Sequence, residues 1–126
     1  YARVMAQDEA YDLFQNGMRL LEAGDFHAAT VPLARVRDVE PDKTSIREAL
    51  GRALFGAQRY TEAAVEFAAV VERAPTNDYA LFCLGRSLQQ LGRHVEAIKP
   101  LALACCLRPE RSDYRMYRDR ARERAA

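Results

Sequence analysis

The chain has 126 residues, of which 49% are hydrophobic, and a formal net charge of +1 at pH 7. This length and composition suit a single globular domain, and the balanced charge gives no general attraction to nucleic acid or acidic lipid. No apolar run approaches the roughly 18 residues that a membrane span requires. The sequence therefore predicts no membrane span.

Three prolines divide the chain into similar segments. Pro41, Pro75 and Pro109 are 34 residues apart, and glycine, leucine and alanine recur with the same spacing. A fixed period of this length is typical of repeat proteins. We therefore predict a lead-in, three repeat units and a C-terminal capping helix, at residues 1–9, 10–43, 44–77, 78–111 and 112–126.

Each unit is predicted to contain two helices. Asp8 can cap the first helix, because a carboxylate there accepts hydrogen bonds from free backbone donors. Gly24 and Gly92 are predicted to form left-handed turns. Pro32 and Pro100 lie inside second helices, where each should remove one backbone hydrogen bond and bend the helix. The predicted helices span residues 9–22, 26–39, 45–57, 60–73, 79–91, 94–107 and 111–124.

A glycine recurs in the middle of the first helix of each unit, as Gly17, Gly51 and Gly85. Glycine at such a position costs about 1 kcal/mol relative to alanine. Its recurrence therefore indicates close approach of the second helix, and the alanine that recurs in the second helix is predicted to be the other half of that contact.

The last predicted helix carries Tyr114, Tyr117 and Ala121 on one face, and charged residues cover the others. A repeat array needs an end element with a polar outer side, because its last unit otherwise exposes an apolar face. We interpret this segment as that cap.

Seven arginines and four acidic residues follow one another between residues 108 and 124. Basic segments can bind phosphates, so nucleic-acid binding is an alternative for this helix. The acids alternate with the arginines at helical spacing, which predicts ion pairs of Asp119 with Arg115 and Arg122. This pattern favours a solvated helix, and we do not expect nucleic acid as a partner.

The sequence contains no recognisable catalytic or metal-binding pattern. His27 and His94 lack a cysteine, acid or second histidine at a metal-ligand spacing. Cys83 has no base at a position that the repeat would bring close to it. We therefore predict a protein that is not an enzyme and needs neither a metal nor a cofactor.

The three cysteines, Cys83, Cys105 and Cys106, argue against a disulfide framework because their number is odd. Stable disulfides belong to oxidising compartments, so reduced thiols predict a cytoplasmic location. The excess of arginine over lysine, together with many alanines, suggests a bacterial source.

The 34-residue helix–turn–helix unit, with its recurring small and large positions, resembles the tetratricopeptide repeat family over residues 10–109. The resemblance implies an all-α fold: an α-solenoid of helix–turn–helix repeats in a right-handed superhelix of about seven helices. It also implies that the first helices line a concave groove.

In that family the groove is formed by first-helix positions on either side of the repeat glycine. An aromatic surface with isolated arginines is typical of a binding hot spot. The resemblance thus implies a scaffold or adaptor that holds a peptide or helix of a partner protein, with arginines pairing with carboxylates. The predicted groove residues are Tyr11, Phe14, Met18, Arg52, Phe55, Tyr79, Phe82, Arg86 and Gln89.

Several alternatives stay open at this point. The groove could be covered by the N-terminal residues, or Phe14 and Phe82 could pack against their neighbours. The chain could associate with copies of itself, or form an adaptor arm of a larger enzyme or regulatory protein. The family's lysine and asparagine clamp for a chaperone's C-terminal carboxylate is absent, because those positions hold Phe14, Met18, Ala49, Tyr79 and Cys83.

Overall fold

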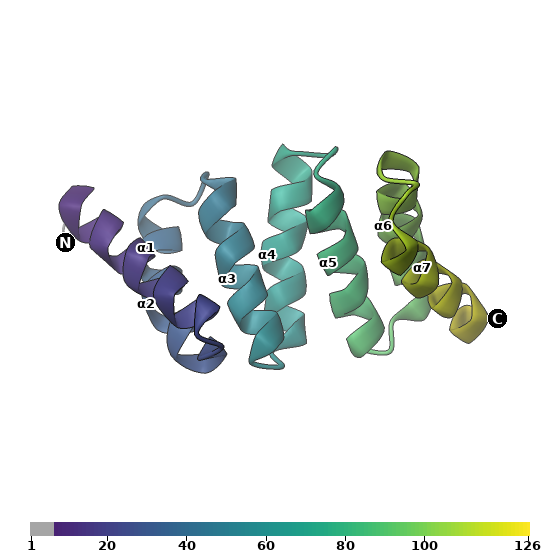
Figure 1. Ribbon diagram of the computed structural model, residues 1–126, viewed down its shortest axis with the longest axis horizontal. Coiled ribbons are helices and arrows are strands. Elements are labelled where there is room, and N and C mark those ends of the chain that lie inside the picture. Colours follow the sequence, from purple (N-terminus) through teal and green to yellow (C-terminus); the bar gives the residue numbers. More distant parts are fainter. Residues whose placement is uncertain (1–6) are drawn as a thin grey trace.

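The computed structural model describes residues 7–126, which form seven α-helices that follow one another along an elongated array (Figure 1). Three helices have the predicted bounds and the other four differ by one or two residues. The helices are α1 (Gln7–Glu22), α2 (Phe26–Val39), α3 (Thr44–Gly56), α4 (Tyr60–Arg73), α5 (Asp78–Gln90), α6 (His94–Leu107) and α7 (Ser112–Ala125).

Four helix starts differ from expectation, and the starts of α1 and α5 involve capping residues. Because α1 begins at Gln7, Asp8 lies inside its first turn and the predicted cap at Asp8 is wrong. A negative charge in the first turn is still favourable next to the free backbone donors. Asn77 caps α5, since its Oδ1 accepts a hydrogen bond from the Ala80 amide at 3.0 Å.

The turns within the three units share one left-handed position. Gly24 has φ of 78° and Gly92 has φ of 76°, as predicted. Gln58 occupies the corresponding place between α3 and α4 with φ of 63°. A glycine therefore fills this place in units one and three, whereas an ordinary side chain fills it in unit two.

The repeat glycines are places of close helix approach, as predicted, but their nearest neighbour is a large side chain rather than the predicted alanine. A Cβ atom added to any of them would lie under 3 Å from a side chain of the second helix of the same unit. Real Cβ atoms essentially never come this close to another atom. The nearest atoms belong to a large side chain four residues after the recurring alanine. The distances are 2.6 Å from Gly17 to Leu33, 2.8 Å from Gly51 to Phe67 and 2.5 Å from Gly85 to Leu101.

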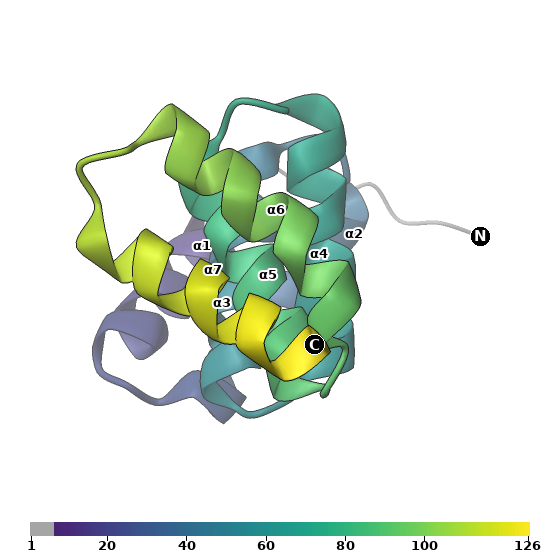
Figure 2. The same cartoon turned by 90° about the vertical axis from the view of Figure 1, so that its right-hand side faces the viewer.

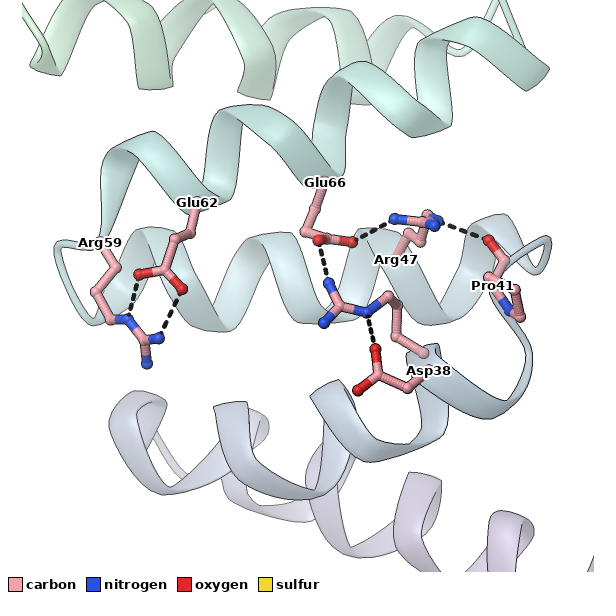
Figure 3. A network of polar contacts seen from close by, with 7 residues as sticks. Asp38, Pro41, Arg47, Arg59, Glu62 and Glu66 are labelled. Carbon is pink, nitrogen blue, oxygen red and sulfur yellow. Dashed lines mark hydrogen bonds and ion pairs between the residues drawn. The ribbon is translucent and has the colours of Figure 1, made fainter. Parts of the chain in front are cut away.

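The second helices continue past their internal prolines, and Pro32 and Pro100 are buried. Glu66 stands at the corresponding position of α4 and is only 3% exposed. Its carboxylate accepts hydrogen bonds from Arg37 of α2 and from Nη1 of Arg47 of α3, the latter at 3.0 Å (Figure 3). These partners offset the desolvation of a buried charge, and they tie α2, α3 and α4 together.

At the C-terminal end, α7 packs across α6 and touches α5 (Figure 2). Tyr114 and Ala121 are fully buried, which confirms the predicted inward face. The Tyr114 hydroxyl donates to Oδ2 of Asp78 at 2.7 Å. The cap is therefore held by both apolar packing and a hydrogen bond to the start of α5.

The ion pairs of α7 are partly as predicted. Asp119 pairs with Arg118 at 2.9 Å and with Arg122 at 4.0 Å. The predicted pair with Arg115 is wrong, because the Arg115 guanidinium donates to the Pro109 carbonyl instead. Arg115 thus bonds to the loop that precedes α7 instead of pairing with an acidic side chain on the helix.

Candidate functional site

The odd-numbered helices form one face of the array, which we call the inner face. A cavity of about 270 Å³ opens on it between α3 and α5. Five of the nine predicted groove residues line this cavity, and Phe26 of α2 contributes a further ring. We call it the aromatic cavity; the five predicted residues are Arg52, Phe55, Tyr79, Phe82 and Arg86.

Aromatic rings shape the walls of this cavity. Phe55 contacts the ring of Tyr60 edge-on, with 5.1 Å between centroids. Tyr79 is 39% exposed. The Arg86 guanidinium lies 5.9 Å from the centre of the Phe55 ring, within cation–π range. The cavity therefore combines apolar surface with a positive charge fixed beside it.

Two side chains that line the cavity, Cys83 and Tyr79, have raised pKa values. Burial raises the pKa of the Cys83 thiol to about 12. Burial, together with the neighbouring Cys83, raises the pKa of Tyr79 to about 12. Because the thiolate is the reactive form of cysteine, Cys83 is not an activated nucleophile.

Arg52 and Arg86 differ from most arginines of the chain in having no carboxylate partner. Nine other arginines among residues 7–126 form ion pairs, such as Arg59 with Glu62 at 2.7 Å. Across residues 7–126, neither Arg52 nor Arg86 forms an ion pair. Two cations are thus available on the inner face beside the aromatic rings.

The cap reaches three of the predicted groove residues. The Phe82 ring stacks on Tyr114 with 4.5 Å between centroids. The Arg86 guanidinium lies 3.9 Å from the centre of the Tyr117 ring, and Nε2 of Gln89 donates to the Tyr117 carbonyl at 2.8 Å. The packing of Phe82 against a neighbour, one of the alternatives above, is therefore what the structure shows.

The remaining predicted residues lie toward the N-terminal end. Tyr11, which is 62% exposed, and Phe14 line a separate cavity of about 370 Å³ between α1, α2 and α3. Met18 packs against the main hydrophobic core. The predicted set is thus distributed over different cavities rather than gathered in one.

Among the residues that the structure describes, no group of three histidine, cysteine or acidic side chains could hold a metal ion. None of the seven helices between residues 7 and 126 is both long and apolar enough to cross a bilayer.

Comparison with known proteins agrees with this architecture. A family model described as tetratricopeptide repeat matches residues 14–78 and 49–113. No curated protein matches the chain.

Solved structures confirm the predicted α-solenoid of helix–turn–helix repeats in a right-handed superhelix. The structure titled "MamA MSR-1 C2" superposes with a TM-score of 0.85 at 27% identity, over 97% of this chain and 71% of that one. The structure titled "MamA RS-1 ArsTM double mutant" gives 0.89 at 23% identity, over 95% of this chain and 67% of that one. The first TPR of Spaghetti (RPAP3), bound to the HSP90 peptide SRMEEVD, gives 0.84 at 16% identity, over 97% of both chains.

Proposed function

The chain belongs to the tetratricopeptide repeat family, and on that premise we propose that it is a non-enzymatic scaffold that holds a peptide or helix of a partner protein on its inner face. The observation that carries this proposal is the aromatic cavity, where Phe55 and Tyr79 adjoin two arginines without carboxylate partners. Aromatic rings and arginine are the side chains most enriched in binding hot spots.

The physical argument rests on what a ligand would gain there. A side chain entering the cavity would bury apolar surface, worth about 25 cal/mol per Å². A carboxylate on the ligand would find in Arg52 a planar donor group with no competing partner, and charge-assisted hydrogen bonds of this kind are about twice as strong as neutral ones. The site therefore suits a ligand with apolar and acidic groups close together.

The relative with the HSP90 peptide supports a peptide ligand only through its fold, because its identity to this chain is 16%. The clamp positions of this chain hold apolar or small residues such as Phe14 and Ala49. We therefore propose a different peptide, anchored by an aromatic or aliphatic side chain.

A library of random peptides selected on the immobilised protein tests the proposal. We expect the selected sequences to combine an apolar anchor with an acidic residue. Their affinity should fall at least tenfold in Arg52→Glu, because the cation is replaced by a like charge, and also in Tyr79→Ala, which removes a cavity wall. Binding would be measured by fluorescence polarisation, and helix content by circular dichroism.

Lys99→Glu is the matched control for Arg52→Glu, because it makes the same charge change on an exposed residue of α6 outside the aromatic cavity. Its affinity for the peptides should stay within twofold of wild type. Equal losses in both charge variants, or no loss in Tyr79→Ala, would reject the inner face as the binding surface.

Self-association is a second candidate, favoured by apolar residues on the opposite face. Val31 and Val65 are 63% and 60% exposed and border a cavity of about 530 Å³ between α2 and α4. Copies of the chain that paired through this surface would bury both valines. A constant monomer mass in light scattering across a hundredfold range of concentration would reject this candidate.

An adaptor arm within a larger enzyme or regulatory protein is the third reading, and sequencing the full gene would decide it. All three cysteines have free thiols, which fits a reducing compartment. We include a cytoplasmic, bacterial setting in the proposal on this ground and on the composition of the sequence.

A further inference from the structure

A second cavity of about 210 Å³ opens where α5, α6 and α7 meet. Its walls are polar and cationic, in contrast to those of the aromatic cavity. Arg86 lines both cavities, so the two adjoin. We call it the basic cavity; its lining residues are Arg86, Gln89, Gln90, His94, Arg120 and Arg124.

The two cavities occupy corresponding places in the repeat array. Most residues of the basic cavity lie two repeat lengths after residues that line the aromatic cavity. An arginine is kept at one position, while apolar or small residues at the others are replaced by polar ones. The pairs are Leu21 with Gln89, Phe26 with His94, Arg52 with Arg120 and Gly56 with Arg124.

The charges of the basic cavity are not neutralised from within the chain. Arg120 and Arg124 form no ion pair with any residue in the described range 7–126. Arg122, which lies on α7 outside the cavity, is 4.0 Å from Asp119. Arg86 and Arg120 lie 3.9 Å and 5.2 Å from the centre of the same Tyr117 ring. Because both guanidiniums also line the basic cavity, an anion bound there would lie near two positive charges.

Two contacts hold Arg86 in place before any ligand arrives. Its guanidinium lies over the Tyr117 ring, and its Nη1 donates to Oε1 of Gln89 at 3.1 Å. Gln89 is itself buried and bonded to the Tyr117 carbonyl. Preorganised donors lose little conformational freedom on binding, so Arg86 is suited to receive a planar carboxylate.

His94 adds an unexplained polar atom to the same cavity. Its Nδ1 is buried and is the one buried side-chain nitrogen or oxygen without a hydrogen-bond partner in the described part of the chain. Such orphaned atoms are rare in folded proteins and call for a reason.

We propose that the basic cavity binds carboxylate groups of the peptide whose apolar anchor occupies the aromatic cavity. This inference rests on the proposed function and adds the ligand's chemistry and direction: acidic residues point toward α7 and the apolar anchor toward α3. A water molecule occupies about 30 Å³ of liquid, so the cavity accommodates a carboxylate together with bound waters. Because the cavities share Arg86, the two parts of the ligand lie only a few residues apart, at about 3.3 Å per residue of extended chain.

Carboxylates can come from acidic side chains or from a chain end, and two forms of one probe separate these sources. Acetylated triglutamate with an amidated C-terminus offers side-chain carboxylates alone, and the same peptide with a free C-terminus adds the terminal one. Each would be titrated into ¹⁵N-labelled protein while the arginine Nε–Hε resonances are followed by NMR. We expect saturable shifts of Arg86, Arg120 and Arg124 with the amidated form.

The double variant Arg120→Gln, Arg124→Gln should weaken triglutamate binding at least tenfold. Arg122→Gln is the matched control, because it removes one charge from the same helix outside the cavity, and it should change the affinity less than twofold. Equal weakening in the control, shifts that do not saturate, or tighter binding of inorganic phosphate than of triglutamate would overturn the proposal. Binding that required the free C-terminus would overturn the assignment to acidic side chains.

The outcome is separable from that of the proposed function. Tyr79→Ala lies outside the basic cavity and should leave triglutamate binding unchanged. If the protein bound triglutamate but the peptide library yielded no binders, the proposed function would be rejected and the basic cavity would still stand as a carboxylate site. If the selected peptides bound the Arg120→Gln, Arg124→Gln variant as tightly as wild type, the role of the basic cavity would be rejected and the proposed function would still stand.

Discussion

Gln58 occupies a backbone position that its neighbouring repeats give to glycine, and its replacement by glycine should stabilise the protein. Its φ of 63° lies in the left-handed region. The turn is otherwise the same in all three units, because the next residue's amide bonds back to the first helix at 2.9, 2.8 and 2.9 Å, from Asp25, Arg59 and Arg93. The three turns thus form an internal comparison within one molecule.

The magnitude follows from two opposing contributions. A left-handed conformation costs an ordinary residue about 1–2 kcal/mol. Glycine lowers the free energy of unfolding by about 0.5–1 kcal/mol, because it is more flexible in the unfolded chain than other residues. Gln58 is exposed and its side chain makes no hydrogen bond within residues 7–126. Gln58→Gly should therefore raise the free energy of unfolding by about 0.5–1 kcal/mol.

Urea unfolding followed by circular dichroism measures this change. Gly24→Ala and Gly92→Ala should lower the free energy of unfolding by about 0.5–1 kcal/mol, because nothing lies within 4 Å of the added Cβ and only backbone strain remains. Gln15→Gly on the exposed side of α1 makes the same chemical change in a helix and should also be destabilising, by about 0.5–1 kcal/mol. A Gln58→Gly protein no more stable than wild type would refute the reasoning.

Two further predictions concern the cap and the buried thiol. Tyr114→Phe removes the hydrogen bond to Asp78 and should lower the free energy of unfolding by about 1.5 kcal/mol. The control Tyr117→Phe should change the free energy of unfolding by less than about 0.5 kcal/mol. Equal effects of the two variants in urea unfolding would contradict the role of that bond. Because the pKa of Cys83 is raised to about 12, iodoacetamide at pH 9 should alkylate the exposed Cys106 first, and equal rates would contradict the burial. Because the pKa of Cys83 is higher in the folded than in the unfolded state, its contribution to the free energy of unfolding is fully present below the unfolded pKa of about 8.5. That effect is lost as the pH rises through about 12, so the free energy of unfolding should fall over this window, less so in Cys83→Ala.

The repeat period predicted the helices well because each repeated position has one physical task. Gly51 recurs where Phe67 of the partner helix approaches within 3 Å of an added Cβ, and prolines recur where second helices end. Gln58 was missed although the period marks its place, since glycine was read as the signal of the turn rather than the position itself.

The candidate site was harder to predict because its contacts cross between unlike parts of the chain. Arg86 lies at a groove position of the third unit, but its neighbour Tyr117 belongs to the cap, which follows no repeat consensus. The basic cavity was missed although the period marks its place. Arg120 and Arg124 lie two repeat lengths after Arg52 and Gly56, but the charges of the last helix were read as a solvated surface. The period thus marks the positions of these residues, whereas the change from apolar or small to polar side chains gave no signal that they share a cavity.

Arg86 lines both the aromatic and the basic cavity, so the proposed occupants of the two cavities would share one guanidinium. A ligand group that shifts this guanidinium toward one cavity changes the free energy of binding in the other. Thermodynamic linkage requires the factor to be the same in both directions. On the proposed assignment, a single arginine would link the recognition of an apolar anchor to the acidic residues that accompany it.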